Sequence, residues 1–154
     1  MAARPFQLGT IKTTSMAKVE SKIGALRQNE DQVYDFLNDF RNLDPLVPQD
    51  KVSNWESTQD TCRFDIAGAG SIAMEIIERE PHKLIKLRSK DQSPVPFTLW
   101  MQIKQVKERD TRIKLTAKAE MNPFMKAMLT KHLKKGLDGI VDKLSEYFGD
   151  TSGL

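Results

Sequence analysis

The chain has 154 residues, of which 39% are hydrophobic and 29% charged, and its mean hydropathy is −0.49. This size and balance are typical of one globular domain in water. The formal net charge of +3, from 24 basic and 21 acidic residues, is too small to indicate a nucleic-acid-binding protein. No apolar run approaches the roughly 20 residues of a membrane span, so we expect no integral membrane segment.

A single cysteine, Cys62, excludes an intrachain disulfide and fits a reducing compartment. Residues 1–15 show no hydrophobic period and no continuous apolar segment of the kind that a secretory signal needs. We therefore expect a cytoplasmic protein with a flexible tail over 1–15, one domain over 16–149 and a short tail over 150–154. Met16 opens the patterned segment, so a start of translation at Met16 rather than Met1 is a hypothesis that the sequence leaves open.

Residues 17–26 alternate in polarity and predict a half-buried strand, whose inner face would carry Val19, Ser21, Ile23 and Ala25. The segment NEDQVYDFLNDF, residues 29–40, predicts a short helix in which Asn29 and Gln32 form a capping box. Residues 42–48 contain two prolines and three apolar side chains that need burial. We expect them to form a second short helical turn against the body of the domain.

The middle of the chain returns to strand periodicity, with expected strands over 52–58, 61–67, 71–80, 83–90, 97–107 and 111–119. Short turns join most of these strands, which favours an antiparallel meander. The adjacent Ile76 and Ile77 interrupt the alternation and predict a bulge. One face of the sheet is apolar, so it needs a covering layer.

The stretch from Asn122 to Phe148 supplies that layer. It predicts a helix of roughly 39 Å with an apolar stripe of Met125, Met128, Leu129, Leu133, Leu137, Ile140, Val141, Leu144 and Phe148. Asn122 is a good N-cap, Pro123 suits the first turn, and Gly149 is expected to end the helix.

This order of elements resembles the helix-grip fold of the START-like, or SRPBCC, superfamily, which includes START lipid-transfer domains, polyketide cyclases and the birch pollen allergen. The resemblance covers residues 17–148 and rests on NEDQVYDFLNDFRNLDPLVP, GAGSIAMEIIEREPHKLIKLRS and TRIKLTAKAEMNPFMKAMLTKHLKKGLDGIVDKLSEYF. It implies an α+β fold: an antiparallel sheet of six to seven strands wraps around the long C-terminal helix, and two short helices follow the first strand.

The resemblance further implies an apolar cavity between the sheet and the long helix. Its expected lining is Phe40, Leu43, Leu46, Phe64, Met74, Leu87, Leu99, Met101, Leu115, Met125, Met128, Leu129, His132 and Leu133. Flexible methionines suit an adaptable pocket, but methionine at helical spacing is equally a core filler. His132 is either a polar group in the cavity or a residue at its boundary.

The sequence provides no catalytic or metal-binding constellation. Two histidines without a neighbouring carboxylate or cysteine pattern do not predict a metal site, and no nucleophile, base and orienting group come together. Cys62 alternates with Phe64 and Ile66, which favours a buried thiol over a reactive one. We expect no catalytic residue, no metal and no cofactor.

Fold does not fix function, so three interpretations stay open. The first is binding or transport of an apolar or amphipathic, lipid-like small molecule. The second is a cyclase- or aromatase-like enzyme that uses the same cavity. The third is a protein-interaction module of the chaperone-activator type.

Two surface features bear on partners. Trp100 falls on the solvent side of its strand, which predicts a homodimer or protein contact, or else a cover provided by Phe6 or Leu8 of the tail. Lys131, Lys134 and Lys135 form a basic cluster on the long helix, which is either a surface for anionic lipid or nucleic acid or simply a solvated face.

Overall fold

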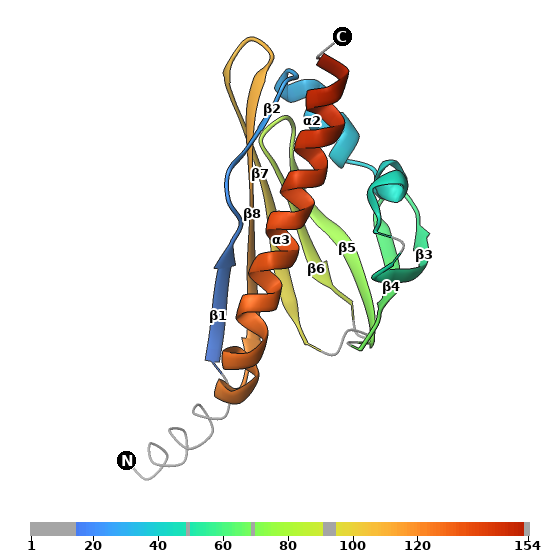
Figure 1. Ribbon diagram of the computed structural model, residues 1–154, viewed down its shortest axis with the longest axis vertical. Helices are drawn as coiled ribbons and strands as arrows, with labels where there is room; N and C mark the ends of the chain where they lie inside the picture. Colours follow the sequence, from blue (N-terminus) through green and yellow to red (C-terminus); the bar gives the residue numbers. More distant parts are fainter. Residues whose placement is uncertain (1–14, 49, 69, 91–94, 153–154) are drawn as a thin grey trace.

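A computed structural model of the chain describes residues 15–48, 50–68, 70–90 and 95–152 (Figure 1). The expected tail over 1–15 lies outside the described residues, apart from Ser15, which opens the first strand. Within the described ranges the chain forms one antiparallel sheet, two short helical segments and one long helix. None of the helices in this part of the chain is long and apolar enough to cross a membrane.

The described residues contribute eight strands to the sheet. They are β1 Ser15–Glu20, β2 Gly24–Leu26, β3 Val52–Ser57, β4 Thr61–Ile66, β5 Gly70–Glu80, β6 Leu84–Ser89, β7 Phe97–Lys107 and β8 Asp110–Met121. Their order is β1-β8-β7-β6-β5-β4-β3, and β2 also pairs with β8. The predicted meander from β3 to β8 is therefore confirmed, and the N-terminal strands join its far end.

The helical segments are α2 Glu30–Leu37, the 3-10 helix η1 Phe40–Leu46, and α3 Pro123–Ser152. The predicted N-cap of α3 is confirmed, because Asn122 Oδ1 accepts a 2.8 Å hydrogen bond from the Met125 N–H. The predicted stop at Gly149 is wrong, since α3 runs on to Ser152. Glycine permits a left-handed helix end but does not impose one.

The predicted capping box of α2 is also wrong. Asn29 is the N-cap residue, but its side chain makes no capping hydrogen bond. Instead, Asn29 Oδ1 accepts from the Arg109 N–H at 2.8 Å and from Gln105 Nε2 at 3.1 Å, while Gln105 Oε1 accepts from the Glu30 N–H at 2.8 Å. The polar groups that begin α2 therefore attach the helix to the β7–β8 hairpin.

The expected first strand is interrupted between β1 and β2. Ser21 donates its N–H to the Leu115 carbonyl at 2.8 Å, and its hydroxyl accepts from the Leu115 N–H at 2.9 Å. The segment from Glu20 to Gly24 has one residue more than the stretch of β8 that it pairs with. The side chains that follow therefore point to the opposite face of the sheet from the one that strict alternation predicts. Ile23 and Ala25, which were expected to be buried, are exposed, and the inner positions fall to Gly24 and Leu26.

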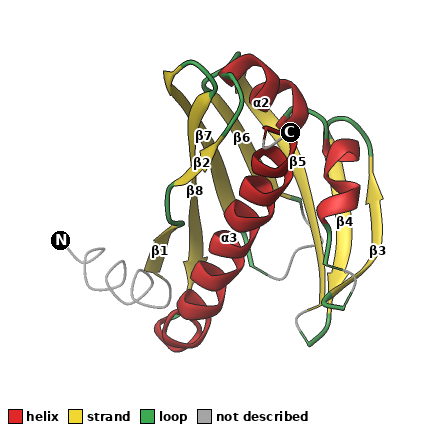
Figure 2. Cartoon of the chain, turned by 45° about the horizontal axis from the view of Figure 1, so that its top comes forward, coloured by secondary structure: helices red, strands yellow, loops and turns green. Residues whose placement is uncertain are grey.

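The long helix α3 lies over one side of the sheet, against β1, β2 and β8, and is inclined to the strands (Figures 1 and 2). Its C-terminal half contributes Leu137, Val141, Leu144 and Phe148 to the main core. Near its start, Met125 and Leu129 pack on a smaller cluster of Ala17, Ala119 and Met121. Two members of the predicted stripe, Met128 and Ile140, are exposed, because the side of an inclined helix that touches the sheet changes along its length.

Helix α3 approaches the sheet closely at Gly24. A Cβ atom at this position would lie 2.5 Å from Val141 Cγ1 and 3.3 Å from Ile113 Cγ2. Next to it, the Lys22 N–H donates to Asp138 Oδ1 at 2.7 Å. The interruption between β1 and β2 therefore joins helix and sheet through a hydrogen bond and a close packing contact.

Candidate functional site

The inner side of β3, β4 and β5 carries apolar side chains that the core covers only partly. The strand register places Phe64 opposite Ile72 and Cys62 opposite Met74, and Ile76 faces Leu87 of β6. The ring of Trp55 stacks on Phe64, with centroids 5.6 Å apart and an interplanar angle of 27°. We call Trp55, Phe64, Met74 and Ile76, which are all half-buried at the edge of the main core, the inner apolar face.

A bulge in β3 places Trp55 opposite Phe64. Ser53 pairs with Asp65 and Glu56 with Arg63, so two residues of β3 oppose a single residue of β4. Asn54 takes the left-handed conformation, with φ 55°, which asparagine tolerates better than most residues. Its Nδ2 donates to Asp65 Oδ2 at 2.7 Å.

Asp65 links the bulge to the next strand. Besides the Asn54 amide, its carboxylate accepts a 2.5 Å hydrogen bond from the Ser71 hydroxyl of β5. The Asn54 hydrogen bond, followed by that of Ser71, lowers the pKa of Asp65, so the carboxylate stays ionised and keeps both donors. The polar network behind the inner apolar face thus fixes the backbone that presents Trp55.

The indole N–H of Trp55 is buried and has no hydrogen-bond acceptor among the described residues. A buried donor without a partner costs roughly 1–3 kcal/mol, so such groups are rare in folded proteins. The ring that carries this N–H belongs to the inner apolar face.

The fourteen residues predicted to line a cavity fall into four groups according to their burial and the cluster they pack on. Five lie fully inside the main core: Phe40, Leu87, Leu99, Met101 and Leu115. Five are half-buried at its edge: Leu43, Leu46, Phe64, Met74 and Leu133. Two pack on the small cluster, Met125 and Leu129, and two are exposed on α3, Met128 and His132. Two of the fourteen, Phe64 and Met74, belong to the inner apolar face that we propose below as the binding site.

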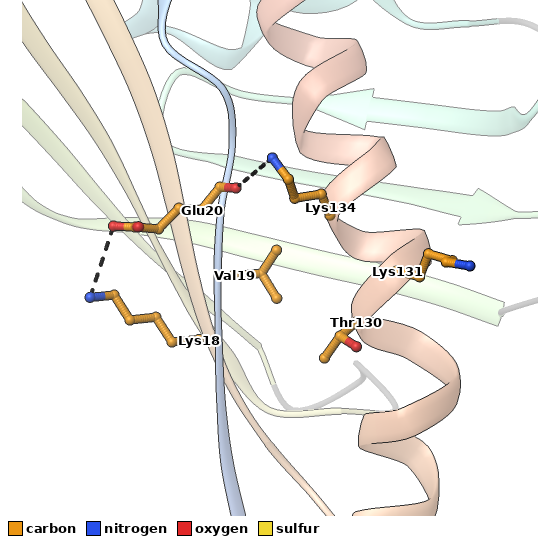
Figure 3. A pocket seen from close by; sticks show the side chains of 6 residues that line it. All are labelled: Lys18, Val19, Glu20, Thr130, Lys131 and Lys134. Atoms are coloured by element: carbon orange, nitrogen blue, oxygen red, sulfur yellow. Dashed lines mark hydrogen bonds and ion pairs between the residues drawn. The ribbon is translucent and has the colours of Figure 1, made fainter.

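Two hollows of the described surface are lined by other residues. One, of about 380 Å³, lies between β1 and α3 and is lined by Lys18, Val19, Glu20, Thr130, Lys131 and Lys134 (Figure 3). The other, of about 310 Å³, lies on the outer side of the sheet and is lined by Lys18, Glu20, Trp100, Gln102, Thr116 and Lys118. Both are open, and in each of them the lysines outnumber the single carboxylate, Glu20.

Trp100 is half-buried on the outer side of the sheet. Lys86 Nζ and Lys118 Nζ lie 5.4 and 5.5 Å from the centre of its ring, within the range of cation–π attraction. The two lysines thus partly cover Trp100, which the sequence suggested as an exposed contact for a second copy or a protein partner. Phe6 and Leu8, the alternative cover, fall outside the described ranges.

The inner side of the sheet holds one thiol, Cys62, and burial raises its pKa to about 12. A thiol with so high a pKa is protonated at neutral pH, and it is therefore a poor nucleophile. His82 makes an edge contact with the ring of Tyr34, at 5.6 Å between centroids. Across the residues that the structure describes, no three His, Cys, Asp or Glu side chains gather as a metal site.

Sequence reasoning missed Trp55 as a member of the inner apolar face. Its strand reads VSNWES and shows no clean alternation, because the bulge changes the period at Asn54. The available signal was the Asn-Trp pair itself: asparagine is favoured at positive φ, and a tryptophan in a short strand needs cover.

No known protein-family model matches the chain, and no curated protein matches its sequence. Solved structures do match. Norcoclaurine synthase from Thalictrum flavum, a point mutant in complex with a transition-state analogue, is 10% identical, with a TM-score of 0.74 over 90% of this chain and 98% of that one.

Bacterial structures align as well. A START superfamily protein from Mycobacterium smegmatis is 12% identical, with a TM-score of 0.70 over 88% of this chain and 98% of that one. A protein from Rhizobium loti is 12% identical, with a TM-score of 0.64 over 86% of this chain and 96% of its own. The chain thus has the START-like, helix-grip α+β fold, as the sequence predicted.

Proposed function

We propose that the protein binds an apolar or amphipathic small molecule of lipid-like character on the inner apolar face, beside α3. The observation that supports this is the position of α3. It lies against β1, β2 and β8, while Trp55, Phe64, Met74 and Ile76 on the other half of the sheet stay half-buried. Burial of the remaining apolar area of these side chains would contribute roughly 25 cal/mol per Å² to binding. Sequestration or transfer in the cytoplasm is the role that we propose for this site.

The ligand that we propose carries a hydrogen-bond acceptor. The indole N–H of Trp55 is buried without an acceptor in the described part of the chain. A carbonyl, ether or hydroxyl oxygen that displaced the groups covering this N–H would relieve the cost of the unpaired donor and fix the orientation of the ligand. An amphipathic molecule with one oxygen near an apolar or aromatic body fits this chemistry.

Two naphthalene probes test the site. Titration should show that 2-acetylnaphthalene binds more tightly than naphthalene, which has the same rings without the oxygen. Trp55→Phe keeps the aromatic surface but removes the donor, so it should reduce that preference by about 2–10-fold. Trp100→Phe, on the outer side, is the matched control and should leave both affinities unchanged.

Native mass spectrometry of the full chain, followed by solvent extraction, identifies a natural ligand. An adduct that is lost on denaturation would support the carrier function. The proposal would be refuted if neither probe bound and incubation with cell lipid extract left the mass unchanged.

A second candidate is an enzyme of the cyclase or aromatase type, which the likeness to norcoclaurine synthase in fold supports. Such a function needs a group that moves protons beside the ligand. Turnover of an extracted ligand, rather than its unchanged release, would favour this alternative.

The interaction module, or a homodimer formed through Trp100, would be favoured if Trp100→Glu broke an assembly and the inner apolar face bound nothing.

A further inference from the structure

The first turns of α3 carry an exposed stripe on the side away from the sheet. Phe124 is 73% exposed and Met128 is 54% exposed, and Lys131 and Lys135 are also exposed. Their spacing of four, three and four residues places all four on one side of the helix. We call Phe124, Met128, Lys131 and Lys135 the outer stripe.

The part of α3 that carries the outer stripe has a single sign of charge. From Pro123 to Leu137 the sequence has four lysines and no acidic residue, and Asp138 is the first carboxylate of the helix. Lys134 Nζ turns back to the Glu20 carbonyl at 3.1 Å and to Asp138. Lys131 and Lys135, in contrast, form no ion pair within the described residues.

The hollow beside the outer stripe strengthens the positive field. Figure 3 shows Lys134 reaching toward β1 while Lys131 projects away from it. The hollow contains one carboxylate, Glu20, which already pairs with Lys114 Nζ at 3.1 Å. The amino end of α3 adds the positive end of the helix dipole. An anion that approaches this end of the molecule is therefore attracted by several fixed charges.

We propose that the outer stripe docks the protein on an anionic lipid surface. Exposed phenylalanine and methionine at one end of the stripe enter the interface between headgroups and acyl chains, and the lysines further along bind phosphate groups. A helical segment with apolar and basic residues on its solvent side, and no acidic ones, is typical of such contacts. The charge of the stripe selects an anionic membrane over a neutral one. The docking does not depend on what the inner apolar face binds.

Vesicle flotation of the full chain tests the proposal. The protein should float with vesicles of equal parts phosphatidylcholine and phosphatidylglycerol, and not with phosphatidylcholine alone. Raising the salt from about 0.1 M to about 0.5 M should weaken binding, because the charges are exposed. Lys131→Gln with Lys135→Gln should weaken it by roughly fivefold per lysine removed. Phe124→Ser with Met128→Ser should weaken it by tenfold or more by loss of apolar burial.

A matched control pair is Ile77→Ser with Val106→Ser, since these side chains are 42% and 50% exposed on other elements. This pair should float like the wild type, and thermal melting should show that every variant folds. The proposal is overturned if the wild type does not bind the anionic vesicles, or if the control pair loses binding as much as the stripe variants. It is also overturned if light scattering shows a dimer that Phe124→Ser with Met128→Ser dissociates, because the stripe is then an interface between two copies.

Discussion

Replacing Gly24 by alanine tests whether α3 is seated on the sheet as described. The new Cβ would lie 2.5 Å from Val141 Cγ1, 3.2 Å from Ser145 Oγ and 3.3 Å from Ile113 Cγ2. Carbon atoms pack best at about 3.5–4.0 Å, so α3 would have to move by about 1 Å or Val141 would have to leave its rotamer. Inserting a methyl group into a well-packed core costs about 1–3 kcal/mol.

Urea unfolding measures this cost as a lower midpoint, and the melting temperature should fall by about 2–4 °C per kcal/mol. Val141→Ala removes the atom that clashes. The double variant should therefore lose less stability than the two single variants together, with a coupling of about 0.5–3 kcal/mol. Two additive single effects, or a Gly24→Ala variant as stable as the wild type, would contradict the close approach of α3 to β2.

Three further predictions follow from local structure. Gly136→Ala should raise the free energy of unfolding by about 1 kcal/mol in a urea titration, because open space surrounds this helical position. The Lys22 N–H lowers the pKa of Asp138, so this carboxylate stabilises the fold above the unfolded pKa of about 4 and less as pH falls. The stability advantage of wild type over Asp138→Asn should then be present at pH 7 and shrink in acid, and an advantage that persisted in acid would contradict this linkage. Cys62 should resist a thiol reagent until denaturant is added, because its side chain is only 2% exposed and burial raises its pKa to about 12. Fast labelling of the native protein would contradict its burial.

The elements that follow one clear period could be predicted from the sequence. The strand from Phe97 to Lys107 has the predicted bounds, and the Ile76–Ile77 pair does mark a shift of register between β5 and β6. In contrast, the bulge at Asn54 and the extra residue near Ser21 depend on the partner strand. A one-residue shift exchanges the two faces, so Trp55 and Gly24 could not be assigned to the inner side from local pattern.

By itself, the sequence determined the START-like order of elements, because alternation, helical spacing and turn residues act within a few positions of the chain. Only the tertiary structure decided which members of the predicted stripe of α3 are buried. An inclined helix changes its contact side along its length, so Met128 faces solvent whereas Met125 and Leu129 pack on the small cluster. The tertiary structure also decided the inner apolar face. Its four side chains come from three strands, and they are brought together by the strand register and by ring stacking between residues that are not neighbours in sequence.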